Sequence, residues 1–457
     1  MLATMPVLTK PIFESKWMFC LMGTLLLLLG AFYNGFPLLN PDDGTYLNVA
    51  FTNSTAADRP PFYSFFIAAT AVYKTIWLPI IFQCLLLSFL IVEMILVWLP
   101  SAGFKMIGLI FFLLVALTPI AWFSGQLSAD IFCAIMILSL VLFLEQSAVW
   151  KSIIFASIFF FSLLTHNSNV FSALAFLIFC LVWIYFFHKS QIKKVLQLTT
   201  ITILAFFTIC TVNLIEHQSF TFSKVGHVFL MGKLIEAGIL KQFLDDNCRQ
   251  ENYPLCAYKD SLPSFASDFI WLEQSPFHKT GGWDNSKESY NHIIHQTLTQ
   301  PKYIKLHALE SITKTASLLR LTYAGDGFYN FSPSSNVYQY VKNLVPNDLI
   351  PMLAAKQQQD KLNLDIFNSL YIPFLLLSTF LLLIFSYVTH QKFRFYIAVV
   401  LGLIVTNAFV AATFANILSR LNARVIWLIP LLFILLLFKE WNNILKPMKE
   451  LIFHHKK

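Results

Sequence analysis

Long apolar windows alternate with short polar loops along most of this chain. A window of about 20 apolar residues is the length that an α-helix needs to cross the hydrocarbon core of a bilayer. The pattern therefore predicts an all-α polytopic membrane protein with about ten transmembrane helices. The ten windows lie near residues 17–37, 77–99, 104–123, 127–145, 152–166, 169–187, 195–215, 366–388, 394–415 and 423–438.

Two of the apolar stretches allow more than one interpretation. The first, Trp17 to Tyr33, follows Lys10 and Lys16 as the core of a signal peptide would, but no small-residue cleavage site follows it, so we expect an uncleaved first span. The stretch 152–187 is apolar except for THNSN, Thr165 to Asn169. This polar insertion predicts two shorter spans joined by a tight turn.

The segment from about 216 to 365 has a different pattern, because it holds most of the acids and its apolar residues are spaced rather than continuous. We expect an extracytoplasmic domain of mixed structure. Within it, Tyr303 to Leu321 has apolar residues three and four positions apart, which is typical of an amphipathic helix. That helix either packs inside the domain or lies on the membrane surface. The chain thus divides into a membrane module at 1–215 with a first outer loop at 38–76, the domain at 216–365, and a membrane region with a cytoplasmic tail at 366–457.

Lysine and arginine fall on one side of the membrane under the ten-span count. Cytoplasmic loops are enriched in these residues, so that side is predicted to be the cytoplasm and to hold both termini. The first outer loop, the 216–365 domain and the loop at 416–424 are then extracytoplasmic, and we expect the inner (plasma) membrane as the location. The residues behind this orientation are Lys105, Lys151, Lys189, Lys193, Lys194, Lys392, Arg394, Lys439, Lys446, Lys449 and the HHKK end.

Composition agrees with a membrane protein. Of 457 residues, 57% are hydrophobic and 12% are charged, whereas a soluble domain has about 25% charged residues. The net charge of +8 comes without a basic stripe interleaved with aromatics outside the membrane flanks. We therefore assign it to cytoplasmic loops and anionic lipid headgroups, and we expect no nucleic-acid partner.

Five of the seven cysteines fall inside apolar windows, where cysteine is an ordinary small core residue. Cys248 and Cys256 are the two on the predicted oxidising side, which predicts a disulfide between them. Metal binding is the weaker interpretation, because no second Cys/His pair has matching spacing.

Charged and polar residues gather at the predicted outer ends of the spans. Taken singly, each has a structural explanation: Asp42 and Asp43 suit a turn, Asp130 suits a helix N-terminus, and an arginine can reach lipid headgroups. Ionisable residues that border spans are costly, however, and tend to be paired or functional. Together they predict one outward-facing cavity lined by Asp42, Asp43, Arg59, Gln126, Asp130, His166, Arg420 and Arg424.

The order of these features resembles the bacterial GT-C glycosyltransferases, which include the aminoarabinose transferases and the protein O-mannosyltransferases. The likeness rests on the Asp42-Asp43 loop after the first span, the Arg59-Pro60-Pro61 that leads into the second, and GQLSAD, Gly125 to Asp130, at the start of the fourth. It covers mainly residues 17 to 215, the seven-span module that these enzymes share. The segment 216–365 indicates no subfamily.

The resemblance implies an inverting hexosyl- or pentosyltransferase of the cell envelope. Its donor would be a polyprenyl-phosphate-linked sugar, and its acceptor a lipid, a polysaccharide or a protein, as in lipopolysaccharide or glycoprotein biosynthesis. Asp42 or Asp43 would be the general base, with Asp42 favoured as the nearer to the span. Arginine holds phosphate through two hydrogen bonds from its planar fork. The remaining candidates would bind substrate, namely Arg59, Arg420 and Arg424 on the phosphate and Gln126, Asp130 and His166 beside them.

The resemblance leaves the metal and the function class open. Some members of that superfamily bind a divalent cation at the first-loop acids, and Asp42 and Asp43 offer oxygen ligands without a fixed metal spacing. The main alternative function is a transporter or flippase of a lipid-linked or small polar substrate. The acids lie at span ends rather than at mid-membrane, and no paired halves are visible, which disfavours transport. An O-antigen-ligase-like enzyme and a non-catalytic scaffold are weaker alternatives.

Overall fold

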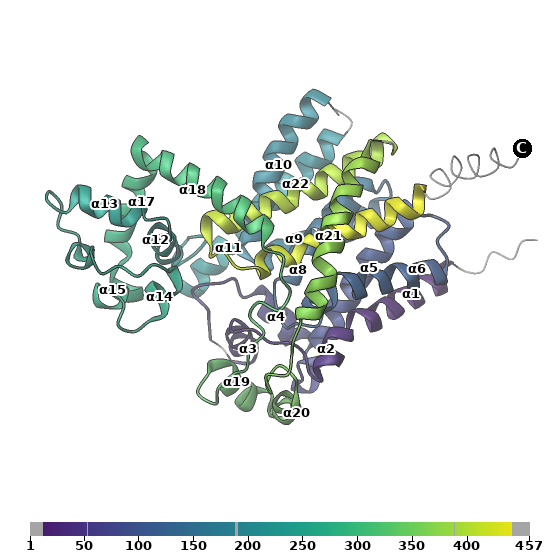
Figure 1. The fold of residues 1–457 in the computed structure, drawn as a ribbon, viewed down its shortest axis with the longest axis horizontal. Coiled ribbons are helices and arrows are strands. Elements are labelled where there is room, and N and C mark those ends of the chain that lie inside the picture. Colours follow the sequence, from purple (N-terminus) through teal and green to yellow (C-terminus); the bar gives the residue numbers. More distant parts are fainter. Residues whose placement is uncertain (1–11, 53, 188–190, 388, 441–457) are drawn as a thin grey trace, which may run out of the picture.

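The computed structural model describes residues 12–52, 54–187, 191–387 and 389–440. These residues form helices and loops and contain no strand, which confirms the all-α class (Figure 1). The expectation of mixed structure in 216–365 is wrong for its described residues, which form α-helices, 3-10 turns and loops. The reason is that apolar residues there recur at helical spacing and not at the alternate positions of a strand.

Six helical segments among the described residues are long and apolar enough to cross a membrane. Four shorter apolar helices, α6 (Phe104–Leu117), α8 (Ile131–Glu145), α9 (Val149–Thr165) and α10 (Asn167–Phe187), occupy the other predicted windows, so a total of ten spans remains a prediction. The six are α1 with α2 (Ile12–Leu27 and Leu29–Asn34), α5 (Trp77–Trp98), α11 (Ile192–His217), α21 (Asp365–Ser386), α22 (Gln391–Phe414), and α23 (Arg420–Ile426) with its continuation to Glu440.

Two breaks in the apolar helices shape the end of the bundle that is predicted to face outward. Proline lacks an N–H and disfavours a helical residue before it. Accordingly α6 ends at Leu117, Thr118 is extended, and after Pro119 the chain forms only the short α7 (Ile120–Ser124). His166 is also extended and separates α9 from α10, so the stretch 152–187 is split as predicted.

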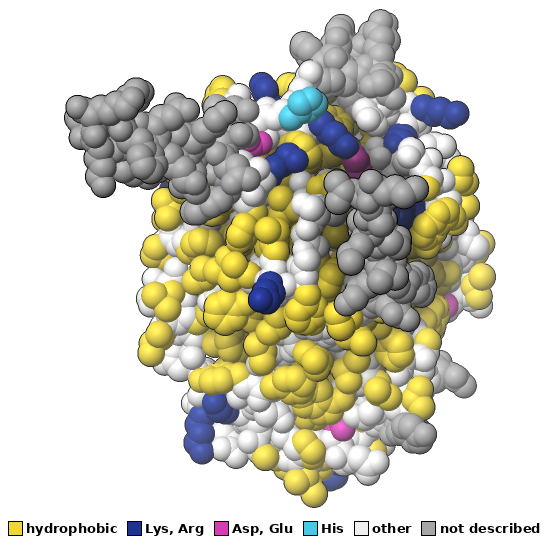
Figure 2. Space-filling view, turned by 90° about the vertical axis from the view of Figure 1, so that its right-hand side faces the viewer, with side chains coloured by type: hydrophobic (Ala, Val, Ile, Leu, Met, Phe, Trp, Pro, Cys, Tyr) yellow, Lys and Arg dark blue, Asp and Glu magenta, His cyan; other side chains and the backbone are white. Residues whose placement is uncertain are grey.

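The core of the bundle is built around α8. This helix is apolar on all sides and nearly every residue in it is buried, as expected of a helix surrounded by others. It packs against α5, α9, α11, α22 and α23. Large apolar side chains also cover much of the outside of the bundle. Figure 2 shows one such face, with Lys and Arg mostly near its upper and lower edges. A surface of this kind suits contact with lipid.

Lysines gather at one end of the bundle. Lys16 and Lys151 both pair with the buried Glu93 on α5. Lys392 at the start of α22 pairs with Glu145 at the end of α8. The sequence analysis places Lys151 and Lys392 on the same side of the membrane, and these contacts put both at one end of the bundle. Which side faces the cytoplasm remains a prediction, and the predicted tail beyond residue 440 lies outside the described residues.

The segment 216–365 contributes to two different cores. Its first part has a core of its own, with Val228, Phe243, Phe269 and Tyr290 among its members, and we call residues 226–300 the outer helical cluster, after the side of the membrane predicted for it. Its last part joins the core of the bundle instead. The helices of the cluster are α12 (Gly226–Glu236), α13 (Ile239–Asn247), η3 (Pro254–Tyr258), α14 (Ala266–Trp271), α15 (Pro276–Lys279), α16 (Gly282–Asn285) and α17 (Lys287–Thr299); beyond them follow α18 (Pro301–Arg320), α19 (Asn336–Leu344), η4 (Pro346–Asp348) and α20 (Leu349–Ala354).

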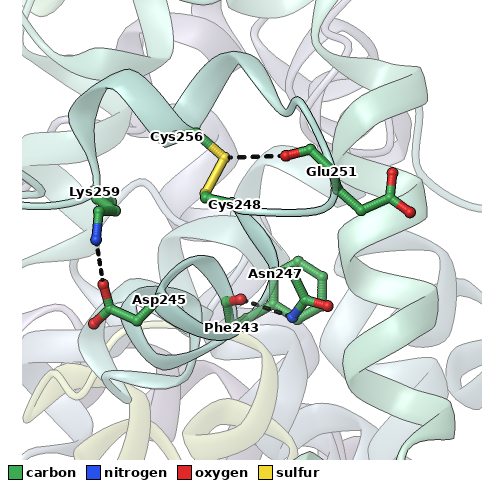
Figure 3. Close-up of a disulfide and its surroundings, with 7 residues drawn as sticks. All are labelled: Phe243, Asp245, Asn247, Cys248, Glu251, Cys256 and Lys259. Carbon is green, nitrogen blue, oxygen red and sulfur yellow. Dashed lines mark hydrogen bonds and ion pairs between the residues drawn. A yellow bond between two sulfur atoms is a disulfide. The ribbon is translucent and has the colours of Figure 1, made fainter.

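A disulfide joins Cys248, which follows α13, to Cys256 in η3 (Figure 3). The Cα atoms are 5.7 Å apart. Lys259 beyond η3 donates to Asp245 in α13 at 2.9 Å, so a second contact ties the same two elements together. The disulfide therefore closes a short loop on the surface of the outer helical cluster.

Candidate active site

The first outer loop is fastened to the turn that precedes α8. The N–H of Leu38 donates to the carbonyl of Gly125 at 2.9 Å, and the N–H of Leu127 donates to the carbonyl of Leu38 at 3.0 Å. Gly125 is required here, because a Cβ at this position would lie 2.8 Å from the backbone nitrogen of Ala31. Gln126, in the middle of this bridge, is buried and receives a hydrogen bond from the side chain of Gln83 on its carbonyl.

Asn40 then orients the two acids of the loop. Its side-chain oxygen accepts from the N–H of Asp42 at 2.8 Å, while its own N–H donates to Oδ2 of Asp43 at 2.7 Å. The helix α3 (Asp43–Phe51) starts from this reciprocal pair. As a result the two carboxylates have different surroundings. The side chain of Asp42 is 35% exposed, and Asp43 is completely buried.

Both carboxylate oxygens of Asp42 are held by arginines. Arg59 donates from Nη2 to Oδ1 at 3.1 Å, and Arg420, from the start of α23, donates from Nη2 to Oδ2 at 3.0 Å. Burial alone would raise the pKa of Asp42, but the two guanidinium groups outweigh it and lower the pKa to about 2. Asp42 is therefore ionised at neutral pH and is a weak base while both arginines hold it.

Asp43 lies in the opposite electrostatic situation. Burial, its strongest influence, raises the pKa of Asp43 well above the ordinary value, and the negative charge of Asp42 raises it further. Its Oδ1 is buried and has no hydrogen-bond partner among the described residues. Burial therefore favours the protonated form of this carboxyl group, although the N–H of Asn40 that donates to it lowers its pKa in part.

Arg59 is fixed from several sides. It donates to Oδ2 of Asp58 from Nη2 at 2.6 Å and from Nε at 3.0 Å, and its guanidinium lies 5.1 Å from the centre of the Tyr46 ring. It also donates to the backbone carbonyl of Asp42 at 3.3 Å. These contacts orient the guanidinium beside the exposed carboxylate, which is the pre-organisation that binding of an anion requires.

A second charged network lies next to the first. Arg424 is fully buried and donates to Asp130 at 2.6 Å and to Asn407 at 2.9 Å. Nε2 of His166 lies 3.9 Å from the same oxygen of Asp130. The hydroxyl of Ser128 connects the networks, because it accepts from the N–H of Asp130 at 3.2 Å and from Asn40 at 3.5 Å.

The structure thus brings all eight candidate residues to one region, at the end of the bundle opposite Lys16, Lys151 and Lys392, in unequal positions. Among the candidate acids, Asp42 alone is partly exposed, and Asp43 and Asp130 are buried. Among the candidate arginines, Arg59 and Arg420 are partly exposed and Arg424 is not. A ligand can therefore reach Asp42, Arg59 and Arg420 first, while Arg424 and Asp130 lie buried next to them.

Two residues that assemble this site were not predicted from the sequence. Gln357 binds the backbone of Leu39 through both its side-chain atoms, at 3.1 and 2.6 Å, and also donates to the carbonyl of Tyr329. Oδ2 of Asp326 accepts from the N–H of Arg420 at 3.2 Å. One signal was available for Asp326, since AGDG places it between two glycines that both adopt positive φ, as a tight turn requires. A lone glutamine such as Gln357 carries no comparable signal.

The residues present do not fit a divalent metal site. Both oxygens of Asp42 are engaged by arginines, and Asp43 is buried with a raised pKa. The described part of the chain contains no group of three or more His, Cys, Asp or Glu residues placed to hold a metal ion. Positive charge at this site comes from Arg59 and Arg420.

Comparison with protein-family models, with curated proteins and with solved structures gives no match to this chain. The likeness to the GT-C glycosyltransferases accordingly rests on the Asp42-Asp43, Arg59-Pro60-Pro61 and GQLSAD motifs of the sequence. It supports a proposal of function and assigns no family.

Proposed function

We propose that this protein is an integral membrane glycosyltransferase that moves a sugar from a polyprenyl-phosphate-linked donor to an acceptor on the outer face of the membrane. The observation that carries the proposal is the partly exposed Asp42 held between Arg59 and Arg420. It combines a carboxylate that can accept a proton with two guanidinium groups that can bind a phosphate. The resemblance to GT-C enzymes supports the same assignment.

In the proposed reaction an acceptor hydroxyl attacks the anomeric carbon of the donor sugar. The new carbon–oxygen bond forms as the bond from that carbon to the phosphate oxygen breaks, and the electron pair leaves with the phosphate. Asp42 takes the hydroxyl proton as general base. Arg59 and Arg420 stabilise the charge of the departing lipid phosphate. Displacement from the face opposite the phosphate inverts the anomeric centre.

Binding of the donor would also change the basicity of Asp42. A lipid phosphate offers the same kind of acceptor oxygens that Asp42 offers, so a bound donor competes with Asp42 for Arg59 and Arg420. When the arginines turn to the phosphate, the pKa of Asp42 rises from about 2 toward its ordinary value. Its carboxylate then becomes a stronger base. Binding of the donor would thus activate the base.

The proposal is tested in cells that lack the protein and are complemented with the wild-type chain, with Asp42→Asn or with Asp260→Asn. Surface lipids, polysaccharides and glycoproteins are compared by mass spectrometry. We expect a sugar-sized mass difference that wild-type protein and Asp260→Asn restore and Asp42→Asn does not. Asp260 serves as the matched control, because it is an exposed acid of the outer helical cluster that pairs only with Lys241 among the described residues.

A transporter predicts a different result. It would change where a lipid-linked intermediate resides, and purified protein would form no new glycosidic bond. Absence of any sugar-sized difference between cells with and without the protein would contradict the transferase assignment.

A further inference from the structure

The exposed face of α18 carries apolar side chains among exposed polar ones such as Lys302, Lys305 and Thr313. Ile304, Leu309 and Ile312 are 44%, 58% and 65% exposed, and Ala308 and Ala316 are exposed beside them. Residues three and four positions apart share one face of a helix, so these five side chains form a continuous strip. We call Ile304, Ala308, Leu309, Ile312 and Ala316 the outer stripe.

The face of α18 that is turned to the protein combines apolar and polar residues: Tyr303, Leu306 and Leu318 pack in cores, and polar residues lie between them. His307, Glu310 and Lys314 all lie at least partly buried, and Glu310 and Lys314 approach each other at 3.6 Å. The charge of Glu310 also acts on Lys233, a buried lysine of α12. Nε2 of His307 and Oε1 of Glu310 are buried and have no hydrogen-bond partner among the described residues.

The exposed apolar residues of α18 are not what water favours. A helix on the surface of a soluble domain turns its apolar stripe inward and its charged residues outward. Here Ile304, Leu309 and Ile312 are exposed while His307 and Glu310 are partly buried, although burying polar groups is costly and exposing apolar side chains to water is unfavourable. The arrangement is favourable where the surroundings of the outer stripe are themselves apolar.

The position of α18 identifies a bilayer as those surroundings. The helix leads from the outer helical cluster to the bundle and packs against the span α22 (Figure 1). Its Leu318 shares a small core with the alanines 408, 411 and 412 of α22. On α22 itself, Val405 and Phe409 are exposed apolar residues. The outer stripe therefore belongs to a helix that packs against a candidate span whose own exposed side chains include apolar ones.

The charges around the stripe agree with this position. Lys305 is exposed within it and Arg320 is exposed at the end of the helix. Basic residues beside an apolar helical face are typical of helices that lie in the headgroup region of a membrane, where their long side chains reach anionic headgroups.

We propose that α18 is an interfacial helix whose outer stripe contacts the acyl chains of phospholipids in the outer leaflet. The helix would hold the outer helical cluster against the membrane surface. This inference does not depend on glycosyl transfer. The sequence allows two positions for this helix, inside a domain or on the membrane surface, and the proposal places it on the membrane surface.

The test uses the full chain in vesicles of phosphatidylethanolamine and phosphatidylglycerol, with the five unpaired cysteines replaced. A spin label is placed by Leu309→Cys or Ile312→Cys, and by Glu288→Cys as a control on the exposed surface of α17. Collision of each label with oxygen, which partitions into lipid, is compared with collision with a water-soluble nickel chelate. Because the labelled positions are exposed, the substitutions remove little packing.

We expect the ratio of oxygen to nickel accessibility at Leu309 and Ile312 to exceed that at Glu288 by several-fold. A ratio equal to that at Glu288 would show that the stripe faces water, and would overturn the proposal. Low accessibility to both reagents would show that protein, such as a second copy of the chain, covers the stripe, and would overturn it as well. A Thr313→Cys label, one residue beyond Ile312 on the same helix, provides a further reading if either stripe variant fails to insert.

Discussion

Asp42 and Asp43 are adjacent in the chain, yet their surroundings give them opposite acid–base properties. Two arginines hold Asp42 as a partly exposed carboxylate whose pKa is about 2, and burial raises the pKa of Asp43. A proton acceptor must be ionised and must be reachable by the hydroxyl that it deprotonates. Asp42 meets both requirements, and Asp43 meets neither. The surroundings of the two side chains therefore favour Asp42 as the base.

The raised pKa of Asp43 predicts how its replacement changes stability with pH. An acid whose folded pKa is raised favours the folded state below its unfolded pKa, about 4, and this contribution is lost as pH rises through the folded pKa. Asp43→Asn removes that loss and can still accept from the N–H of Asn40. We expect its thermal midpoint in detergent at pH 7 to be no lower than that of wild type.

The difference in favour of Asp43→Asn should then widen as pH rises from about 4 toward the folded pKa. Midpoints are measured across this range for both proteins. A midpoint for Asp43→Asn that is lower by the same amount at every pH would show that Asp43 acts as an ionised structural group, which contradicts its assignment as a neutral acid.

The elements that form the site come from distant parts of the chain and are joined by few bonds. The first outer loop is bridged to the turn before α8, and α19 packs against α3. Gln357 connects the loop to the segment that follows α18 through its bonds to Leu39 and Tyr329. One buried side chain thus supports the position of both Asn40 and the carboxylates beyond it.

Gln357→Ala is expected to loosen this connection. Three hydrogen bonds are lost and buried backbone groups of Leu39 are left unpaired, each at a cost of about 1–3 kcal/mol. We predict a lower thermal midpoint and, because the loop carries Asp42, a lower rate of sugar transfer. Gln359→Ala is the control, since Gln359 is exposed and bonds only to Lys361 through its side chain among the described residues. Equal midpoints for the two variants would contradict this role of Gln357.

The Cys248–Cys256 disulfide makes a separate prediction at the scale of elements. It closes a loop with a sequence separation of 8 residues, for which the chain-entropy model gives a contribution of about 2–3 kcal/mol. Protein made in an oxidising compartment should carry this bond. The check is alkylation of unreduced, denatured protein followed by mass spectrometry of the peptide that contains both cysteines. Two alkylated thiols in that peptide would reject the bond.

At the scale of the whole molecule, sequence patterns predict where the helices lie better than they predict which distant side chains come into contact. Hydrophobic windows and the THNSN break mark where the apolar helices lie, because bilayer thickness and polar insertions act locally. The meeting of Arg420 with Asp42 joins residues 378 positions apart, and no local pattern specifies it. The choice of Arg420 for Asp42 and of Arg424 for Asp130 follows from how α23 packs, which a single sequence does not encode in any local signal.

Topology is the prediction for the whole chain. Lysines 16, 151 and 392 lie at one end of the bundle, and Asp42, Arg59 and Arg420 lie together at the other. We expect reporter tags after Lys194 and at Lys457 to be cytoplasmic and a tag near residue 260 to be extracytoplasmic. A cytoplasmic signal from residue 260 would place the candidate site on the cytoplasmic side as well, and would contradict the orientation.

The proposed role of Asp42 as the base in sugar transfer from a lipid phosphate is tested most directly with purified protein in lipid vesicles. A polyprenyl-phosphate-linked sugar with a label on the sugar is supplied together with membrane extract as the source of acceptor, and label in the product is measured over time. We predict transfer by wild-type protein and by Asp260→Asn, and a rate about 10²–10⁴ lower for folded Asp42→Asn. Transfer by folded Asp42→Asn at the wild-type rate would contradict this role.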